Sequence, residues 1–216
     1  MTAAPTRDCR LCPRLAAFRD ENALRFPLWH NAPVPSFGDA RARLLVVGLG
    51  PGLRGANRSG RPFTGDYAGD LLYATLAAHG FARGRFLAPR EDAPWAGDGL
   101  ELVDARVTNA VRCVPPANKP LPAEIRACNG FLGAEIAAMP RLRAIVALGR
   151  VAHEAVLAAL GLRRAAFPFA HGAVHAVGDG RELADSFHCS RYNTNTGRLT
   201  PAMFDAVFAG VRRRLA

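Results

Sequence analysis

The sequence predicts an α/β protein, a three-layer α/β/α sandwich whose central sheet is mainly parallel. Short apolar runs of strand length alternate along the chain with segments of helical periodicity. Parallel strands are joined by such helices and are buried on both faces, which explains why the runs are continuously apolar. Half of the 216 residues are hydrophobic, enough for a large core, and we expect a single domain over residues 1–216.

The elements follow from these patterns in chain order. The first strand is an unbroken apolar run that ends in a glycine-rich turn, and the later strands are short runs rich in valine, isoleucine and alanine. We predict strands over Leu44–Gly48, Arg106–Val111, Ala144–Gly149, Ala173–Val177 and Leu183–Phe187, and helices over Gly69–His79, Ala123–Met139, Val151–Leu160 and Pro201–Leu215. Scattered prolines and glycines predict an irregular surface segment over Gly84–Gly99.

The charge balance is strongly basic, with 28 Lys and Arg against 18 Asp and Glu, a formal net charge of +10. All but Lys119 of these cations are arginines, whose guanidinium groups suit bidentate contacts with phosphate. The charge therefore favours a nucleic-acid partner, although only weakly. No apolar run is long enough to cross a membrane, and residues 1–8 do not resemble a signal peptide, so we expect a soluble cytoplasmic protein.

Four of the five cysteines form a separated set: Cys9 and Cys12 near the start, then Cys113 and Cys128 far along the chain. In the cytoplasm paired cysteines rarely form structural disulfides. Four converging thiolates suit a [4Fe–4S] cluster or a structural zinc ion, and the spacing does not choose between them. A disulfide, or four unrelated buried thiols, are the less favoured alternatives.

Polar and glycine-rich segments follow the predicted strands, where ligands bind in open α/β sheets. The run Gly48–Gly52 lets backbone approach a ligand closely, but it lacks the Gly-Lys-Ser/Thr of a phosphate-binding Walker loop. Asp66 precedes a predicted helix, where a carboxylate is also a common N-terminal cap. Asn109 ends its strand with an amide that matches a nucleobase edge, although such a residue often only satisfies neighbouring backbone.

A second polar segment, His188–Arg198, combines a histidine with hydroxyls, amides and two arginines. These groups suit contacts with phosphates and base edges, and an ordinary solvated loop is the alternative.

Taken together, these segments resemble family 5 (type b) of the uracil-DNA glycosylases over nearly the whole chain. The resemblance rests on the four cysteines, Gly48–Gly52, the run from Gly55 to Asp66, Thr108–Cys113 and His188–Thr200. The run Gly-Ala-Asn-Arg-Ser-Gly-Arg-Pro-Phe-Thr-Gly-Asp is the most specific of them. Family 4 has an acidic residue where this chain has Leu49, which points to family 5.

The resemblance implies a monofunctional glycosylase that hydrolyses the N-glycosidic bond of uracil, and of other deaminated bases such as hypoxanthine, in double- or single-stranded DNA. Asp66 would orient water or stabilise the positively charged sugar, Asn109 would hold the base or the water, and His188 would donate to a carbonyl oxygen of the leaving base. The resemblance further implies a [4Fe–4S] cluster on Cys9, Cys12, Cys113 and Cys128, in a monomer of the bacterial or archaeal cytoplasm.

The same resemblance implies the residues that contact the substrate. Phe63 would stack on the flipped base, with core packing as the alternative, and Gly48 and Gly50 would let backbone approach the base or a phosphate. Ser190, Arg191 and Tyr192 would lie in the segment that enters the minor groove. One departure is clear: Cys189 stands where the superfamily usually has proline, which predicts a looser segment and a thiol open to oxidation near the active site.

Two other classes of function compete with this hypothesis. A non-catalytic iron–sulfur or zinc module that binds nucleic acid explains the cysteines and the charge. It does not explain why polar and aromatic residues occur together at the ends of the strands, namely Phe63, Asp66, Asn109 and His188. A nucleotide-hydrolysing enzyme explains the glycine-rich turn, but neither the cysteines nor the missing phosphate-loop lysine.

Overall fold

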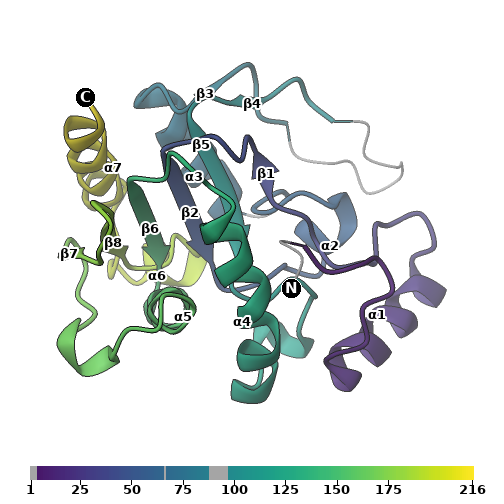
Figure 1. The fold of residues 1–216 in the computed structure, drawn as a ribbon. Coiled ribbons are helices and arrows are strands. Elements are labelled where there is room, and N and C mark those ends of the chain that lie inside the picture. Colours follow the sequence, from purple (N-terminus) through teal and green to yellow (C-terminus); the bar gives the residue numbers. More distant parts are fainter. Residues whose placement is uncertain (1–3, 66, 88–96) are drawn as a thin grey trace.

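The computed structural model describes residues 4–65, 67–87 and 97–216. At its centre lies a six-stranded sheet with the strand order β1-β5-β2-β6-β8-β7 (Figure 1). The strands are β1 Phe37–Gly38, β2 Leu44–Gly48, β5 Ala105–Asn109, β6 Ala144–Leu148, β7 Val174–Ala176 and β8 Glu182–Ser186. The four inner strands run parallel and the two edge strands are antiparallel to their neighbours, which confirms the mainly parallel sheet.

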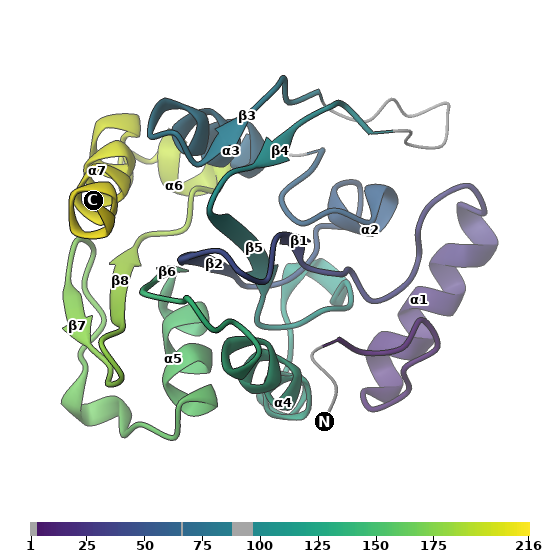
Figure 2. The same ribbon diagram turned by 45° about the horizontal axis from the view of Figure 1, so that its top comes forward.

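Seven α-helices lie within the described residues: α1 Pro13–Arg25, α2 Ala56–Ser59, α3 Tyr67–Ala78, α4 Pro122–Ala137, α5 Arg150–Ala159, α6 Arg191–Asn195 and α7 Pro201–Leu215. A two-stranded ribbon, β3 Ala82–Arg83 with β4 Glu101–Leu102, stands apart from the main sheet. Helices α3 and α7 cover one face of the main sheet, and α4 and α5 cover the other (Figure 2). This arrangement is the expected three-layer sandwich.

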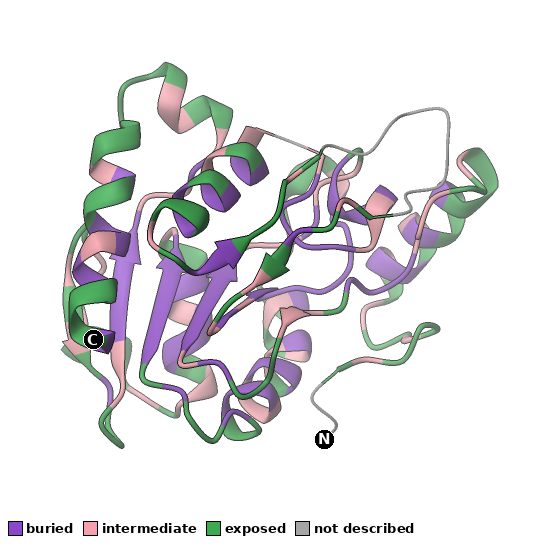
Figure 3. Cartoon of the chain, turned by 90° about the horizontal axis from the view of Figure 1, so that it is seen from above, coloured by how far each residue is buried: buried purple, intermediate pink, exposed green. Residues whose placement is uncertain are grey.

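Alternating side chains of the central strands supply the two halves of the core. In β2, Leu44 and Val46 pack in the cluster beneath α3 and α7, whereas Leu45 and Val47 pack in the cluster beneath α4 and α5. All five residues of β2 and of β6 are buried, as parallel strands covered on both faces require (Figure 3). The sheet is therefore a rigid support for the loops at its carboxyl edge.

Helix α1 and the short helices α2 and α6 were not predicted from the sequence. The buried face of α1 includes Arg19 and Asn22 beside Leu15 and Ala16, so the apolar periodicity that indicates a helix is weak. Its first residue, Pro13, is the residue type favoured at a helix start because its missing N–H has no helical partner there. Within the described residues, no helix combines the length and the apolarity needed to span a bilayer.

Candidate active site

The carboxyl ends of β2, β5 and β8 meet at an open cleft of about 560 Å³. Gly48 and Asn109 are direct partners in the register of β2 and β5, and His188 follows the end of β8 by two residues. The cleft is lined by Leu49, Gly50, Pro51, Gly52, Gly65, Tyr67, Ala68, Pro115, Asn118, His188, Ser190 and Arg191. Of the site residues predicted from the sequence, Gly50, His188, Ser190 and Arg191 line it directly.

Gly48, Phe63 and Asn109 pack tightly against one another at the same edge. A Cβ atom on Gly48 would lie 2.5 Å from Oδ1 of Asn109 and 2.8 Å from Cε2 of Phe63, and closer still to Cζ of that ring. Real Cβ atoms do not approach other atoms this closely, so glycine is required here by space rather than by backbone conformation. The Phe63 ring in turn stacks on His188, with centroids 6.0 Å apart and planes inclined by 26°.

The Asn109 side chain presents an unsatisfied acceptor. Its residue is only 3 % exposed, and Oδ1 has no hydrogen-bond partner among the described residues. A buried acceptor without a partner costs about 1–3 kcal/mol, so it calls for a donor that is absent from the free protein. The N–H of a nucleobase, or a bound water, is a donor of this kind.

His188 is neutral at physiological pH. Burial lowers the pKa of its imidazole to about 4, because the protonated ring loses solvation. A neutral imidazole carries one N–H, which can donate to a carbonyl oxygen that gains negative charge. The side chain of Asn193 donates to the His188 carbonyl at 2.8 Å and holds this part of the backbone.

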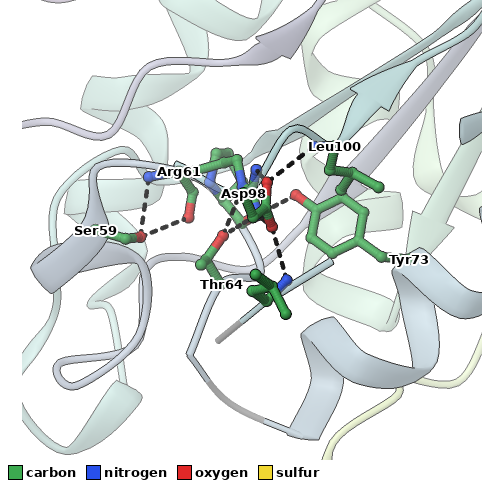
Figure 4. Close-up of polar contacts among 8 residues, drawn as sticks. Ser59, Arg61, Thr64, Tyr73, Asp98 and Leu100 are labelled. Atoms are coloured by element: carbon green, nitrogen blue, oxygen red, sulfur yellow. Dashed lines mark hydrogen bonds and ion pairs between the residues drawn. The ribbon is translucent and has the colours of Figure 1, made fainter. Parts of the chain in front are cut away.

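A buried ion pair anchors the segment that presents Phe63. The Arg61 guanidinium lies 2.6 Å from the Asp98 carboxylate and also donates to Oγ1 of Thr64 at 3.0 Å (Figure 4). The Tyr73 hydroxyl donates to the carbonyl of Pro62 at 2.6 Å. The segment on either side of Phe63 is thus held to α3 and to Asp98.

The position of Asp98 contradicts part of the expectation that Gly84–Gly99 forms an irregular surface segment. Residues 88–96 lie outside the described residues, but the Asp98 carboxylate is buried and is not part of a simple surface excursion. Burial by itself raises its pKa, and the hydrogen bonds from Arg61 and from the N–H groups of Leu87 and Leu100 outweigh that effect, so the pKa lies below its usual value. The carboxylate is therefore ionised and paired.

The second polar segment forms a short helix rather than an open loop. Ser190 precedes α6, and its side chain accepts a hydrogen bond from the backbone N–H of Asn193. The exposed Arg191 lies over the ring of Tyr67, and Tyr192 is 73 % exposed. The segment thus places an exposed aromatic ring and a cation side by side at the rim of the cleft.

The expectation that Cys189 is open to oxidation is wrong. Cys189 has no exposed surface, and its thiol donates to the carbonyl of Ala68 at 3.4 Å. Instead of loosening the segment, it ties His188 and Ser190 to the first turn of α3.

Asp66 lies outside the described residues. Its neighbours in the chain, Gly65 and Tyr67, both line the cleft. Sequence reasoning missed Tyr67, Pro115 and Asn118 as lining residues. The signal for the last two was the turn-forming run Pro-Pro-Ala-Asn-Lys-Pro after Cys113, which predicts a loop close to a strand end.

The four separated cysteines line one cavity beside α1. Cys9, Cys12, Cys113 and Cys128 line one small, mostly apolar cavity, with Cys12 directly before α1 and Cys128 on α4. Burial raises the pKa of Cys12 and of Cys128 to about 11, so metal binding there must displace protons. All four sulfur atoms are described, and no three of them lie within 4.8 Å of one another.

A buried cation adjoins this set of cysteines. Arg19 is 3 % exposed and donates to Sγ of Cys113 at 3.2 Å and to the carbonyl of Cys9. It forms no ion pair with a carboxylate among the described residues. Because a buried, unpaired guanidinium is costly, its position indicates an anionic partner at the sulfur atoms.

Comparisons with known proteins agree with this geometry. The model of the uracil DNA glycosylase superfamily matches residues 35–212. A type-5 uracil-DNA glycosylase of Thermus thermophilus is 48 % identical over 210 residues, which cover 95 % of this chain and 93 % of that protein. A type-5 enzyme of Mycobacterium bovis is 42 % identical over 95 % of this chain and 77 % of its own length.

The type-4 relatives are more distant. A type-4 uracil-DNA glycosylase of Pyrobaculum aerophilum is 32 % identical over 66 % of this chain and 63 % of that protein, whereas a type-5 enzyme of the same organism is 41 % identical over 89 % and 83 %. The difference agrees with the placement suggested by Leu49. The chain belongs to the uracil DNA glycosylase superfamily, in its type-5 branch.

Proposed function

We propose that this protein is a monofunctional DNA glycosylase that hydrolyses the N-glycosidic bond of uracil in DNA. The observation that supports this most directly is the unpartnered Oδ1 of Asn109, buried beside Phe63 at the strand ends that form the cleft. A flipped base supplies what this arrangement lacks, a donor for the amide oxygen and a flat surface for the ring. Gly50 lines the cleft and lets its backbone approach the base or a phosphate, whereas Gly48 leaves room for Phe63 and Asn109, which would hold the base.

The reaction divides among three residues. Asp66 orients water or stabilises the positive charge that develops on the sugar, in a cleft lined by its two chain neighbours. Asn109 holds the base or the water. His188, neutral because of its burial, donates its N–H to a carbonyl oxygen of the leaving base as negative charge builds there.

The side chain of Leu49, in the wall of the cleft, determines which bases we expect the enzyme to remove. Its half-buried apolar side chain lines the cleft and makes no hydrogen bond that would reject a base other than uracil. We therefore expect hypoxanthine and other deaminated bases to be removed as well. Activity confined to uracil, across a panel of oligonucleotides that each contain one damaged base, would contradict this expectation.

The DNA partner is held through phosphates and through the rim of the cleft. Ser190, Arg191 and Tyr192 lie on or beside α6, and the exposed Tyr192 is suited to wedge between bases of the minor groove. The net charge of +10 and the excess of arginine favour phosphate contacts. Affinity for duplex and single-stranded oligonucleotides should then fall steeply with salt, and a flat dependence would argue against DNA.

The cysteine site fits a [4Fe–4S] cluster better than zinc. A tetrahedral zinc ion with Zn–S bonds of about 2.3 Å brings its sulfur ligands to about 3.8 Å from one another. No three of the four sulfur atoms lie within 4.8 Å of one another, so they do not have the arrangement of a tetrahedral zinc site, and Arg19, which donates to Sγ of Cys113, offsets the negative charge of thiolate ligands. When bound, the cluster supplies structural cross-links and no redox step, because glycosidic hydrolysis needs none.

The deciding experiment is single-turnover cleavage of a duplex oligonucleotide that contains one uracil. Wild-type protein is compared with Asp66→Asn, which removes the charge at nearly constant shape. The matched control is Asp70→Asn, which changes an exposed carboxylate of α3 four residues further along the chain. We expect alkali-labile abasic sites from wild type and from Asp70→Asn, and a loss of at least about 100-fold for Asp66→Asn.

Other outcomes have distinct meanings. Equal cleavage by wild type and Asp66→Asn would move the chemistry to Asn109 and His188. No cleavage of any damaged base by folded, iron-loaded protein would reject the glycosylase and favour a module that only binds nucleic acid. Zinc in place of iron in the purified protein would reject the cluster without affecting the activity hypothesis.

A further inference from the structure

A second polar cluster lies between α5 and the β7–β8 pair, and the proposed glycosylase makes no use of it. It consists of His153 on α5, His175 on β7 and Asp185 on β8, with one potential ligand atom of each within 4.8 Å of the others. His153 is 2 % exposed and Asp185 is fully buried, whereas His175 is half-buried. The residues come from three separate elements, so the fold itself brings them together.

The hydrogen bonds of His153 require a proton or a metal ion between its ring and the Asp185 side chain. Its Nε2 lies 2.9 Å from the carbonyl oxygen of Phe167, which can only accept, so Nε2 carries a proton. Its Nδ1 lies 2.7 Å from Oδ1 of Asp185, which as a carboxylate also only accepts. A neutral ring would direct its lone pair at that oxygen, and therefore a proton, carried by the ring or by the carboxyl group, or else a metal ion must lie between Nδ1 and Oδ1.

Two imidazoles and one carboxylate are a donor set for divalent transition metals such as zinc. A histidine that binds a metal usually donates its other N–H to a carbonyl or carboxylate, as His153 does to Phe167. Zinc bonds of about 2.0–2.1 Å place neighbouring ligand atoms about 3.3 Å apart. Nε2 of His175 already lies 3.3 Å from Oδ2 of Asp185, and the contact between His153 and Asp185 needs to open by less than about 1 Å.

Among the described residues, no arginine or lysine forms an ion pair with Asp185. The Phe167 ring meets His175 edge-on at 5.8 Å, and the Phe169 ring meets His153 at 5.5 Å. The nearby Arg150 lies over Phe169 rather than on the carboxylate. With neutral histidines the cluster carries one negative charge in an apolar environment, which a metal ion neutralises strongly. His175 is the most exposed of the three, with 13 % of its side chain accessible to solvent, and an ion would enter from its side.

We propose that His153, His175 and Asp185 bind a divalent transition-metal ion, with Zn²⁺ as the preferred probe, at a site separate from the four cysteines. The ion replaces the proton between Nδ1 of His153 and Asp185 and joins α5 to β7 and β8. Because His188 follows Asp185 by three residues, the ion also stiffens the strand that presents His188 to the cleft. This inference is independent of the proposed glycosylase activity.

The test is a titration of intact, cluster-loaded protein with Zn²⁺ alone, after dialysis against a mild chelator. Iron and zinc are counted separately by mass spectrometry, and calorimetry in buffers of different ionisation enthalpy counts the protons released. We expect one zinc per chain at constant iron, release of about one proton, and a rise in the unfolding temperature with zinc. His175→Gln should weaken binding at least about tenfold.

His79→Gln is the matched control, since His79 pairs with Asp205 between α3 and α7 and should leave zinc binding unchanged. No zinc uptake by wild type, equal uptake by His175→Gln, or uptake matched by loss of iron would each overturn the proposal. If His175→Gln does not fold, ¹⁵N NMR of wild-type His153 decides, because a proton retained at Nδ1 in excess zinc excludes the ion.

Discussion

Substitution of Gly48 by alanine should disable the site with a single methyl group. The added Cβ would lie 2.5 Å from Oδ1 of Asn109 and 2.8 Å from Cε2 of Phe63, whereas unstrained carbon contacts begin at about 3.5 Å. The ring and the amide must therefore move by roughly 1 Å. Overpacking of this kind costs about 1–3 kcal/mol of stability, and a displacement of 1 Å in a catalytic arrangement can cost about 100-fold in rate.

Two measurements check this expectation: the free energy of unfolding from urea titration, and single-turnover excision of uracil from duplex DNA. Gly133→Ala is the control, because its Cβ would lie 3.5 Å from the nearest atom and alanine favours a helix by about 0.5–1 kcal/mol. We expect the control to be slightly more stable and fully active. Wild-type stability and rate for Gly48→Ala would refute the packing argument.

Three further predictions address the surroundings of the cleft. Burial lowers the pKa of His188 from 6.5 to about 4, so between these pH values the unfolded chain binds more protons than the folded protein. The free energy of unfolding should therefore fall by up to about 3 kcal/mol as the pH drops from 6.5 to 4. Urea titrations of His188→Gln should lack this contribution. Arg61→Met leaves Asp98 buried without its partner and should cost about 3–5 kcal/mol in the same assay, against less than about 1 kcal/mol for Arg83→Met, whose ion pair is exposed. Arg19→Met should speed the loss of iron to a chelator, followed by visible absorbance, while the exposed Arg25→Met on the same helix should not; equal rates would remove Arg19 from any role in metal retention.

The sheet and most of its helices were predictable because their signals are local. The run that forms β2 is continuously apolar, and α7 begins at Pro201 and ends at Leu215 as predicted. Helix α1 escaped prediction because its buried face includes Arg19, whose burial depends on Cys113 from a distant part of the chain. Such a face does not repeat in the sequence as an apolar stripe.

The residues of the candidate site also fall into those with a local sequence signal and those without one. The ends of the strands could be identified from glycines and polar residues, but the pairing of Arg61 with Asp98 spans 37 residues and left no local pattern. The burial of Cys189 was likewise hidden, since its position after His188 predicts solvent rather than contact with α3. Residues that follow one another in a motif can therefore point to opposite sides of the backbone.

The buried thiol of Cys189 is a natural probe of local opening in this part of the structure. When a metal cluster occupies the other four of the five cysteines, Cys189 is the one cysteine that binds no metal. A thiol reagent can then react only after the segment that bears His188 separates from Ala68. The labelling rate therefore measures how often this separation occurs. No engineered label is needed, and slower labelling in the presence of DNA would record the stiffening of this segment when substrate is bound.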